Sequence, residues 1–125
     1  MPDVYRDNPN LKRANVQIEW TEEKVKEYTK CLEDPVYFTE NYIKIVSLDK
    51  GLIPFKLYEF QRQMMWTFHT ERFTICKLPR QSGKSTTIIA YLLHYALFNE
   101  TVNVAILENK AVTARDLLGR LQLAY

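Results

Sequence analysis

The stretch Leu78-Pro79-Arg80-Gln81-Ser82-Gly83-Lys84-Ser85 lies between two apolar runs. The run before it, residues 73–78, has the character of a β-strand, and the run after it, residues 85–98, has that of a helix. A phosphate-binding loop joins a strand to a helix and has a Gly, four further residues, and then Gly-Lys-Ser or Gly-Lys-Thr. Residues 83–85 match this pattern, whereas Leu78 occupies the place of the first Gly. Because the tripeptide falls at a strand-to-helix junction, the sequence predicts a phosphate loop here.

The chemistry of phosphate binding explains each residue type in this loop. Gly83 lacks a Cβ atom, so its backbone can turn sharply and approach a phosphate closely. The unpaired N–H groups at the start of the following helix, together with the helix dipole, favour an anion such as a β-phosphate. Lys84 would place a positive charge between the β- and γ-phosphates, and the hydroxyl of Ser85 would bind Mg²⁺. The alternative is an ordinary turn that carries a solvated lysine.

The composition is typical of a soluble globular domain. The chain has 125 residues, of which 46% are hydrophobic and 26% are charged, so it could bury a core of its own. No apolar run approaches the ~18 residues of a membrane span, and the start of the chain has no signal-peptide pattern. Cys31 and Cys76 are far apart, and Cys76 falls in a predicted buried strand, which suggests reduced thiols in a cytosol. The net charge of +2 gives no electrostatic indication of nucleic-acid binding.

Residues that typically begin helices or form turns divide the chain into three predicted regions. Thr21 is expected to cap a first helix, and Asp34-Pro35 to begin a second. Residues 43–48 and 52–55 are expected to form two short strands, joined by a turn at residues 49–51. The regions are an N-terminal arm (1–18), helices with a short hairpin (19–56), and the truncated front part of an ATPase domain (57–125).

The sequence pattern of the third region, residues 57–125, predicts parallel strands. Residues 57–72 have the spacing of a helix. The strand at residues 73–78, the helix at 85–98 and a β-rich run at 102–107 would together make a right-handed βαβ unit. The helix at 85–98 is apolar nearly all round, so further protein should cover its far side. The predicted fold class is therefore α/β: an incomplete parallel sheet of the P-loop NTPase type with an N-terminal helical subdomain.

Gln61 shares a helix face with large apolar residues. A buried, unpaired amide costs about 1–3 kcal/mol, so a glutamine on an inward face needs partners. Its amide could both donate to and accept from an adenine edge. The spacing alone favours the simpler interpretation, in which Gln61 is half-buried and satisfied by nearby backbone.

Similarity to a known family is spread over four stretches, residues 5–12, 34–38, 57–61 and 80–85. Together these stretches resemble the ATPase part of the large terminase subunit of tailed bacteriophages, above all of the contractile-tail type. The resemblance covers nearly the whole chain and implies a RecA/ASCE-like P-loop NTPase fold. That family's phosphate loop lacks the first Gly and has a basic residue near its start, so Leu78 agrees with the family. The similar stretches are Tyr5-Arg6-Asp7-Asn8-Pro9-Asn10-Leu11-Lys12, Asp34-Pro35-Val36-Tyr37-Phe38, Leu57-Tyr58-Glu59-Phe60-Gln61 and Arg80-Gln81-Ser82-Gly83-Lys84-Ser85.

The resemblance implies an ATP-driven motor that moves viral DNA into the prohead, in a full-length protein that is also a nuclease. The implied cofactors are ATP and Mg²⁺. Gln61 would read adenine, Arg80 and Lys84 would be catalytic, and Ser85 would be the Mg²⁺ ligand. Arg80 would act as an arginine finger in cis, the alternative being a structural ion pair in the loop. The implied nucleotide-binding residues are Gln61, Arg80, Gln81, Ser82, Gly83, Lys84, Ser85 and Thr86.

The resemblance also implies partners and a location. The partners are double-stranded viral DNA, the portal protein, the small terminase subunit and further copies of the chain in a ring on the portal, with no membrane. The location is the cytoplasm of the host cell during assembly, and the protein would not be part of the mature virion.

The acids that ATP hydrolysis needs in that family are expected beyond Tyr125. Glu108 follows an apolar run, but it comes too soon after Lys84 to be the Mg²⁺-binding acid. The final helical stripe, residues 113–125, has no stop signal, which predicts a fragment. We therefore expect these 125 residues to bind ATP weakly at best and not to turn it over. Two other classes stay open: a helicase or restriction-type DNA translocase fragment, and a non-catalytic nucleotide-binding or interaction module.

Overall fold

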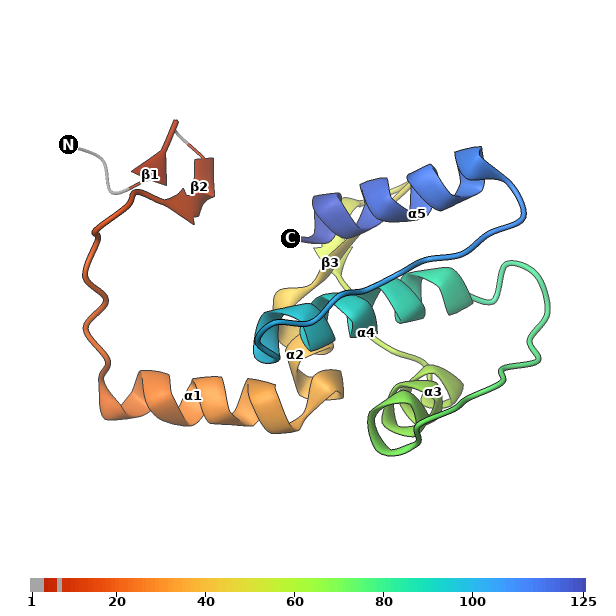
Figure 1. The fold of residues 1–125 in the computed structure, drawn as a ribbon, viewed down its shortest axis with the longest axis horizontal. Helices are drawn as coiled ribbons and strands as arrows, with labels where there is room; N and C mark the ends of the chain where they lie inside the picture. The colour runs from red at the N-terminus through yellow and green to blue at the C-terminus, as the bar shows by residue number, and fades with distance from the viewer. Residues whose placement is uncertain (1–3, 7) are drawn as a thin grey trace.

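Helices dominate the fold (Figure 1). The computed structural model describes residues 4–6 and 8–125, without the side chains of residues 4–5 and 8–12. In these residues there are five helices and two pairs of short strands. The elements are β1 (Val4–Tyr5), β2 (Asn8–Lys12), α1 (Glu22–Glu33), α2 (Pro35–Tyr42), β3 (Lys44–Ser47), β4 (Gly51–Pro54), α3 (Glu59–Thr70), α4 (Lys84–Phe98) and α5 (Ala111–Ala124).

The predicted α/β fold class is wrong. Both strand pairs in the described residues are antiparallel and two-stranded, so the parallel sheet of a P-loop NTPase (RecA/ASCE-like) and its βαβ unit are not found there. Residues 73–78 and 102–107, the two predicted parallel strands, run outside any sheet. Ile75 is 99% exposed and Leu107 is 88% exposed. β-branched and apolar residues favour an extended backbone, but a strand also needs a hydrogen-bonded neighbour, and neither segment has one among the described residues.

Cys76 lies in the first of these two segments. It was predicted to be buried in a strand, and the structure places it on the surface, as an exposed free cysteine. Cys31 is buried and also free. The error has the same origin as the fold error, because burial of Cys76 depended on a sheet around it.

Local signals correctly predicted the starts of α1 and α2 and the β3–β4 hairpin. Thr21 Oγ1 accepts a hydrogen bond from the backbone N–H of Lys24 at 3.3 Å and caps α1. Asp34 Oδ1 accepts one from the N–H of Tyr37 at 2.9 Å, with Pro35 in the first turn of α2. The predicted hairpin is confirmed as β3 paired antiparallel with β4, and Gly51 begins β4 with a φ of +69°.

The N-terminal arm stands apart from the helices in Figure 1. The sequence predicted an extended arm over residues 1–18, of which residues 1–3 and 7 lie outside the described residues. Within the described part, β1 and β2 form an antiparallel pair. An extended segment then leads to α1.

The core lies where α2, α3 and α4 pack together. Met65 of α3 is 0% exposed, and Phe38 of α2 and Leu93 of α4 are buried with it. The buried imidazole of His94 on α4 donates from Nε2 to the carbonyl of Cys31 on α1 at 2.8 Å. These contacts fix α4, and with it the loop at residues 80–83, against the rest of the molecule.

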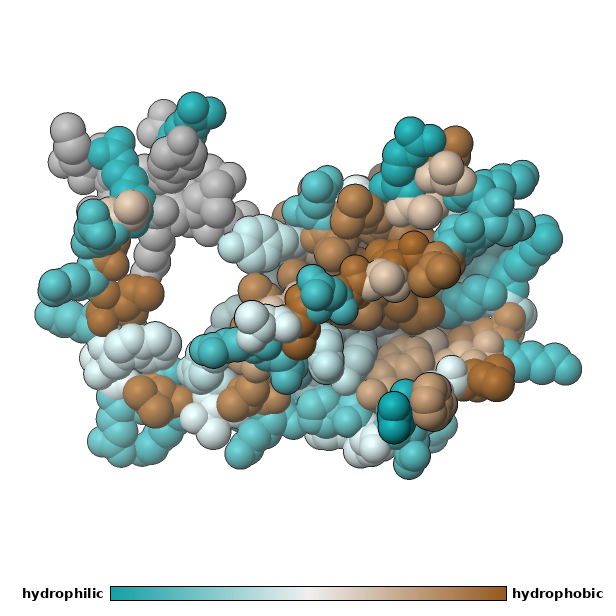
Figure 2. Space-filling view, in the orientation of Figure 1, coloured by the Kyte–Doolittle hydropathy of each residue, from teal (hydrophilic) through white to brown (hydrophobic). Residues whose placement is uncertain are grey.

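The far side of α4 is covered only in part. The sequence predicted that protein would surround this apolar helix, and α5 does pack on it. Ile88 and Leu97 nevertheless remain exposed. Figure 2 shows hydrophobic side chains on the surface over α4, α5 and the segment between them. Among the described residues, no helix combines the length and the apolar character that crossing a membrane requires.

Candidate phosphate-binding site

The loop turns into α4 at Gly83. Gly83 is the N-cap, with φ 78° and ψ 14° in the left-handed region. Its carbonyl accepts hydrogen bonds from Thr87, from the backbone N–H at 3.1 Å and from Oγ1 at 2.9 Å. Helix geometry leaves the first N–H groups of α4 without partners inside the helix. The predicted helix start next to Lys84 is therefore confirmed, and donors for an anion are present there.

Gln61 of α3 lies directly against Gly83. Its Nε2 atom donates to the carbonyl of Gly83 at 3.4 Å, across 22 residues of sequence. A Cβ atom added at Gly83 would lie 2.7 Å from the same Nε2 atom, closer than real Cβ atoms come to other heavy atoms. The site thus needs glycine both for its backbone angle and for its neighbour.

Backbone groups satisfy the Gln61 amide in this conformation. Oε1 accepts from the N–H of Tyr58, the N-cap of α3, at 2.8 Å. The residue is 2% exposed. These contacts are those of a glutamine paired with nearby backbone, and its role as a reader of adenine stays a prediction.

A hollow of about 590 Å³ opens beside these residues, and we call it the loop hollow. It brings together five of the predicted nucleotide-binding residues, and it does not include Arg80, Lys84 or Ser85. Its walls come from the β3–β4 hairpin, the start of α3 and the loop before α4. The residues that line it are Ile45, Ile53, Pro54, Phe55, Lys56, Tyr58, Phe60, Gln61, Gln81, Ser82, Gly83 and Thr86.

Ser82 presents a polar atom that has no partner. Its Oγ is buried and makes no hydrogen bond. Gln81, on one side of it, has a φ of +59°, and Gly83 follows with +78°. A non-glycine residue in the left-handed region costs roughly 1–2 kcal/mol. A strained backbone around an unpaired hydroxyl is a feature of binding loops, because a bound group can satisfy the hydroxyl.

The charges around the loop hollow favour an anion. Lys56 is the one charged residue among those that line it, and no carboxylate is among them. Lys84 is half-buried at the start of α4, and Arg80 is exposed in the turn before it. Among the described residues, neither Lys84 nor Arg80 has an acidic partner within 4.0 Å. The positive charges are thus available to phosphate groups.

Ser85, the predicted Mg²⁺ ligand, is half-buried in the first turn of α4. The described residues contain no group of three or more His, Cys, Asp or Glu side chains placed to hold a metal ion. Glu108 is exposed and follows a segment that is not a strand. The prediction that further acids complete the metal site concerns residues after Tyr125, and it stays a prediction.

Sequence reasoning did not name seven of the twelve residues that line the loop hollow as site residues, among them three just before Gln61. Lys56, Tyr58 and Phe60 all line the loop hollow, together with the hairpin. The rings of Tyr58 and Phe60 are stacked, with centroids 6.0 Å apart and planes 10° apart. The cluster of a lysine and two aromatic residues immediately before Gln61 was the available signal.

No protein-family model matches the chain.

Proposed function

We propose that the loop before α4 binds the triphosphate of ATP. The observation that carries this proposal is the packing of Gln61 against a left-handed Gly83 at the start of a 15-residue helix. The loop hollow fits the group by one feature, the buried hydroxyl of Ser82, which has no hydrogen-bond partner and could donate to a phosphate oxygen. The proposal requires the loop and the helix start, and it does not require a parallel sheet.

Several residues of this chain would each have a separate role in binding the nucleotide. The first N–H groups of α4 and the Ser82 hydroxyl would donate to phosphate oxygens. Lys84 would neutralise phosphate charge, and Ser85 would offer its hydroxyl to Mg²⁺. When bound, Mg²⁺ would neutralise part of the negative charge of the phosphates. Arg80, which is exposed in the turn before α4, would stabilise charge on the transferring phosphoryl group.

With the family resemblance, we infer a role for the whole protein. The chain would be the N-terminal ATP-binding portion of a large terminase subunit, the ATPase that drives viral DNA into a prohead. Its partners would then be double-stranded DNA, the portal protein, the small terminase subunit and further copies of itself. It would act in the host cytoplasm during assembly.

Calorimetric titration of the chain with Mg²⁺-ATP tests the binding proposal. Lys84→Ala should weaken binding about tenfold, the equivalent of about 1.4 kcal/mol, because it removes the charge next to the phosphates. Lys110→Ala is the matched control, since Lys110 is the N-cap of α5 but follows no glycine turn. Equal effects of the two substitutions would show that the loop is not the site. ATP turnover by this chain alone, lost in Lys84→Ala, would contradict the expectation that the catalytic acids lie elsewhere.

A further inference from the structure

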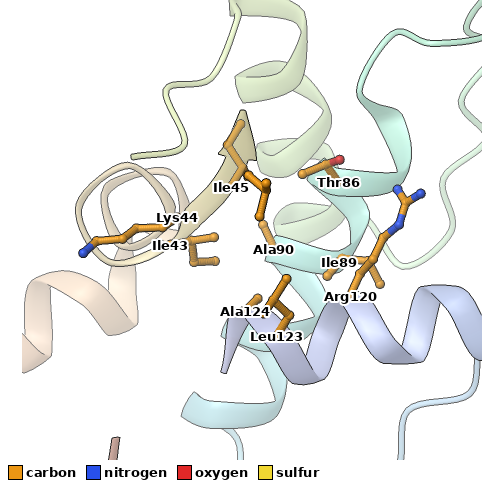
Figure 3. A pocket seen from close by; sticks show the side chains of 10 residues that line it. Ile43, Lys44, Ile45, Thr86, Ile89, Ala90, Arg120, Leu123 and Ala124 are labelled. Carbon is orange, nitrogen blue, oxygen red and sulfur yellow. The ribbon is translucent and has the colours of Figure 1, made fainter. Parts of the chain in front are cut away.

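A second cavity lies next to the loop hollow and shares Ile45 and Thr86 with it. It is a groove of about 320 Å³ between β3, α4 and α5, and we call it the α4–α5 groove (Figure 3). Its floor is aliphatic, with side chains from all three elements. The residues that form the floor are Ile43, Ile45, Ile89, Ala90, Leu123 and Ala124.

One end of the groove is polar and positively charged. Figure 3 shows Arg120 of α5 extending toward Thr86 of α4, whereas the ammonium of Lys44 points away from the other side chains. Lys44 and Arg120 are the charged residues among those that line the groove, and no acid is among them. Nη2 of Arg120 forms an ion pair with the exposed Asp116 at 3.3 Å. Such an exposed pair is weak, so the guanidinium can bind another anion.

We propose that the α4–α5 groove binds a small amphipathic anion, namely a carboxylate with a short aliphatic chain. The carboxylate would accept hydrogen bonds from Arg120 and Thr86, and the chain would lie over Ala90 and Leu123. Charge complementarity favours an anion, because Arg120 extends along the groove in Figure 3 and its ion pair with Asp116 is exposed and weak. The groove volume of about 320 Å³ lies at the lower end of the range for small-molecule sites, so the ligand should be small. This groove adjoins the proposed ATP site, because Ile45 and Thr86 line both cavities, but its other lining residues are different.

Titrations of the chain with three probes of equal chain length test the proposal. Octanoate, octanol and octylammonium are added in turn, and amide NMR shifts are followed at Ala90, Leu123 and the remaining residues. We expect saturable shifts at the groove with octanoate, and an affinity for octanoate about threefold to fivefold higher than for octanol, the range that an exposed ion pair supplies. Octylammonium should bind more weakly than octanol.

Two variants and a control distinguish the contribution of the Arg120 charge from that of the open volume of the groove. Arg120→Gln should lower the affinity for octanoate to that for octanol, and Ala124→Leu should fill the groove and weaken both. Arg115→Gln, on the same helix but outside the groove, should change neither. The NMR spectrum of each variant reports whether it is folded. Absence of saturable shifts in the unsubstituted chain, equal affinities for octanoate and octylammonium, or an equal loss in Arg115→Gln would overturn the proposal.

Discussion

At the scale of single residues, Gly83 is held by two independent constraints. Its φ of +78° belongs to the left-handed region, and Gln61 fills the space where a Cβ atom would stand. The sequence predicted the glycine, because the loop pattern requires a residue that can approach a phosphate. It did not predict the contact with Gln61, since the two residues are 22 positions apart and only the packing of α3 on α4 joins them.

Gly83→Ala should therefore lower the free energy of unfolding by about 2 kcal/mol, from backbone strain and crowding together. Two other glycines are matched controls, measured by urea denaturation. Gly51 also has a positive φ but open space around it, so Gly51→Ala should cost about 1 kcal/mol from strain alone. Gly119→Ala, in the open interior of α5, should stabilise by about 0.5–1 kcal/mol. A cost at Gly83 no greater than at Gly51 would show that the Gln61 contact is unimportant.

Our proposal that the chain is the N-terminal portion of an ATPase assigns Arg80 a role that can be tested in that longer protein. Arg80→Ala should leave ATP binding intact and lower the turnover rate by a factor of ~10³ or more, because a finger acts on the transferring phosphoryl group. ATP affinity and steady-state hydrolysis are measured on the same preparation. Lys77→Ala, three residues earlier and exposed, is the control. If Arg80→Ala weakens binding but bound ATP is still hydrolysed, Arg80 serves in docking instead.

At the scale of elements, the sequence predicted helices better than strands. Thr21 and Asp34 cap their helices through hydrogen bonds to residues three positions ahead, so the signal is local. The β3–β4 hairpin was predictable for the same reason, since its turn lies between its strands. Residues 73–78 have the composition of a strand as well, but pairing depends on a partner that no local pattern specifies.

Hydrogen exchange of backbone amides tests this assignment. Residues 73–78 and 102–107 make no backbone ladder among the described residues, so their amides should exchange within the fastest class, like those of mobile loops. The amides in the middle of α4 should exchange orders of magnitude more slowly, because they are bonded within a helix that carries the core. Strong protection in residues 73–78 would show that they pair with a neighbouring strand.

At the scale of the whole molecule, the candidate site is assembled from three separated parts of the chain. The sequence could identify Gln61 and the loop, because both belong to recognisable patterns. It could not place Lys56 or the β3–β4 hairpin beside them, since that placement follows from how α2, α3 and α4 pack. The loop hollow is therefore a property of the tertiary fold, and its integrity depends on the core.

The core should make stability depend on pH through His94. Burial lowers the pKa of His94 below its ordinary value of 6.5, because the charged ring loses its hydration. Below about pH 6.5 the unfolded chain binds a proton at this residue that the folded chain does not, so stability should fall as the pH drops toward the lower folded-state pKa. Above about pH 6.5 the ring is neutral in both states and contributes no slope.

His94→Phe should remove this acid-side loss of stability, measured by denaturation between about pH 5 and pH 8. At neutral pH it should also cost about 1–3 kcal/mol, because the carbonyl of Cys31 loses its donor. His69→Gln is the comparison variant: the charge of His69 also lowers the pKa of His94, but burial is the largest cause, so most of the loss should remain. An unchanged pH profile in His94→Phe would assign the acid sensitivity to other groups.

The central claim is that one concave site formed by the loop, Gln61 and the start of α4 holds a triphosphate. Titration of the chain with Mg²⁺-ATP, followed residue by residue in amide NMR spectra, tests it most directly. We expect saturable shifts at residues 82–86 and at the Gln61 side chain, reproduced by inorganic triphosphate and lost in Lys84→Ala. Saturable shifts elsewhere with none at these residues, or no saturable shifts at all, would contradict the claim.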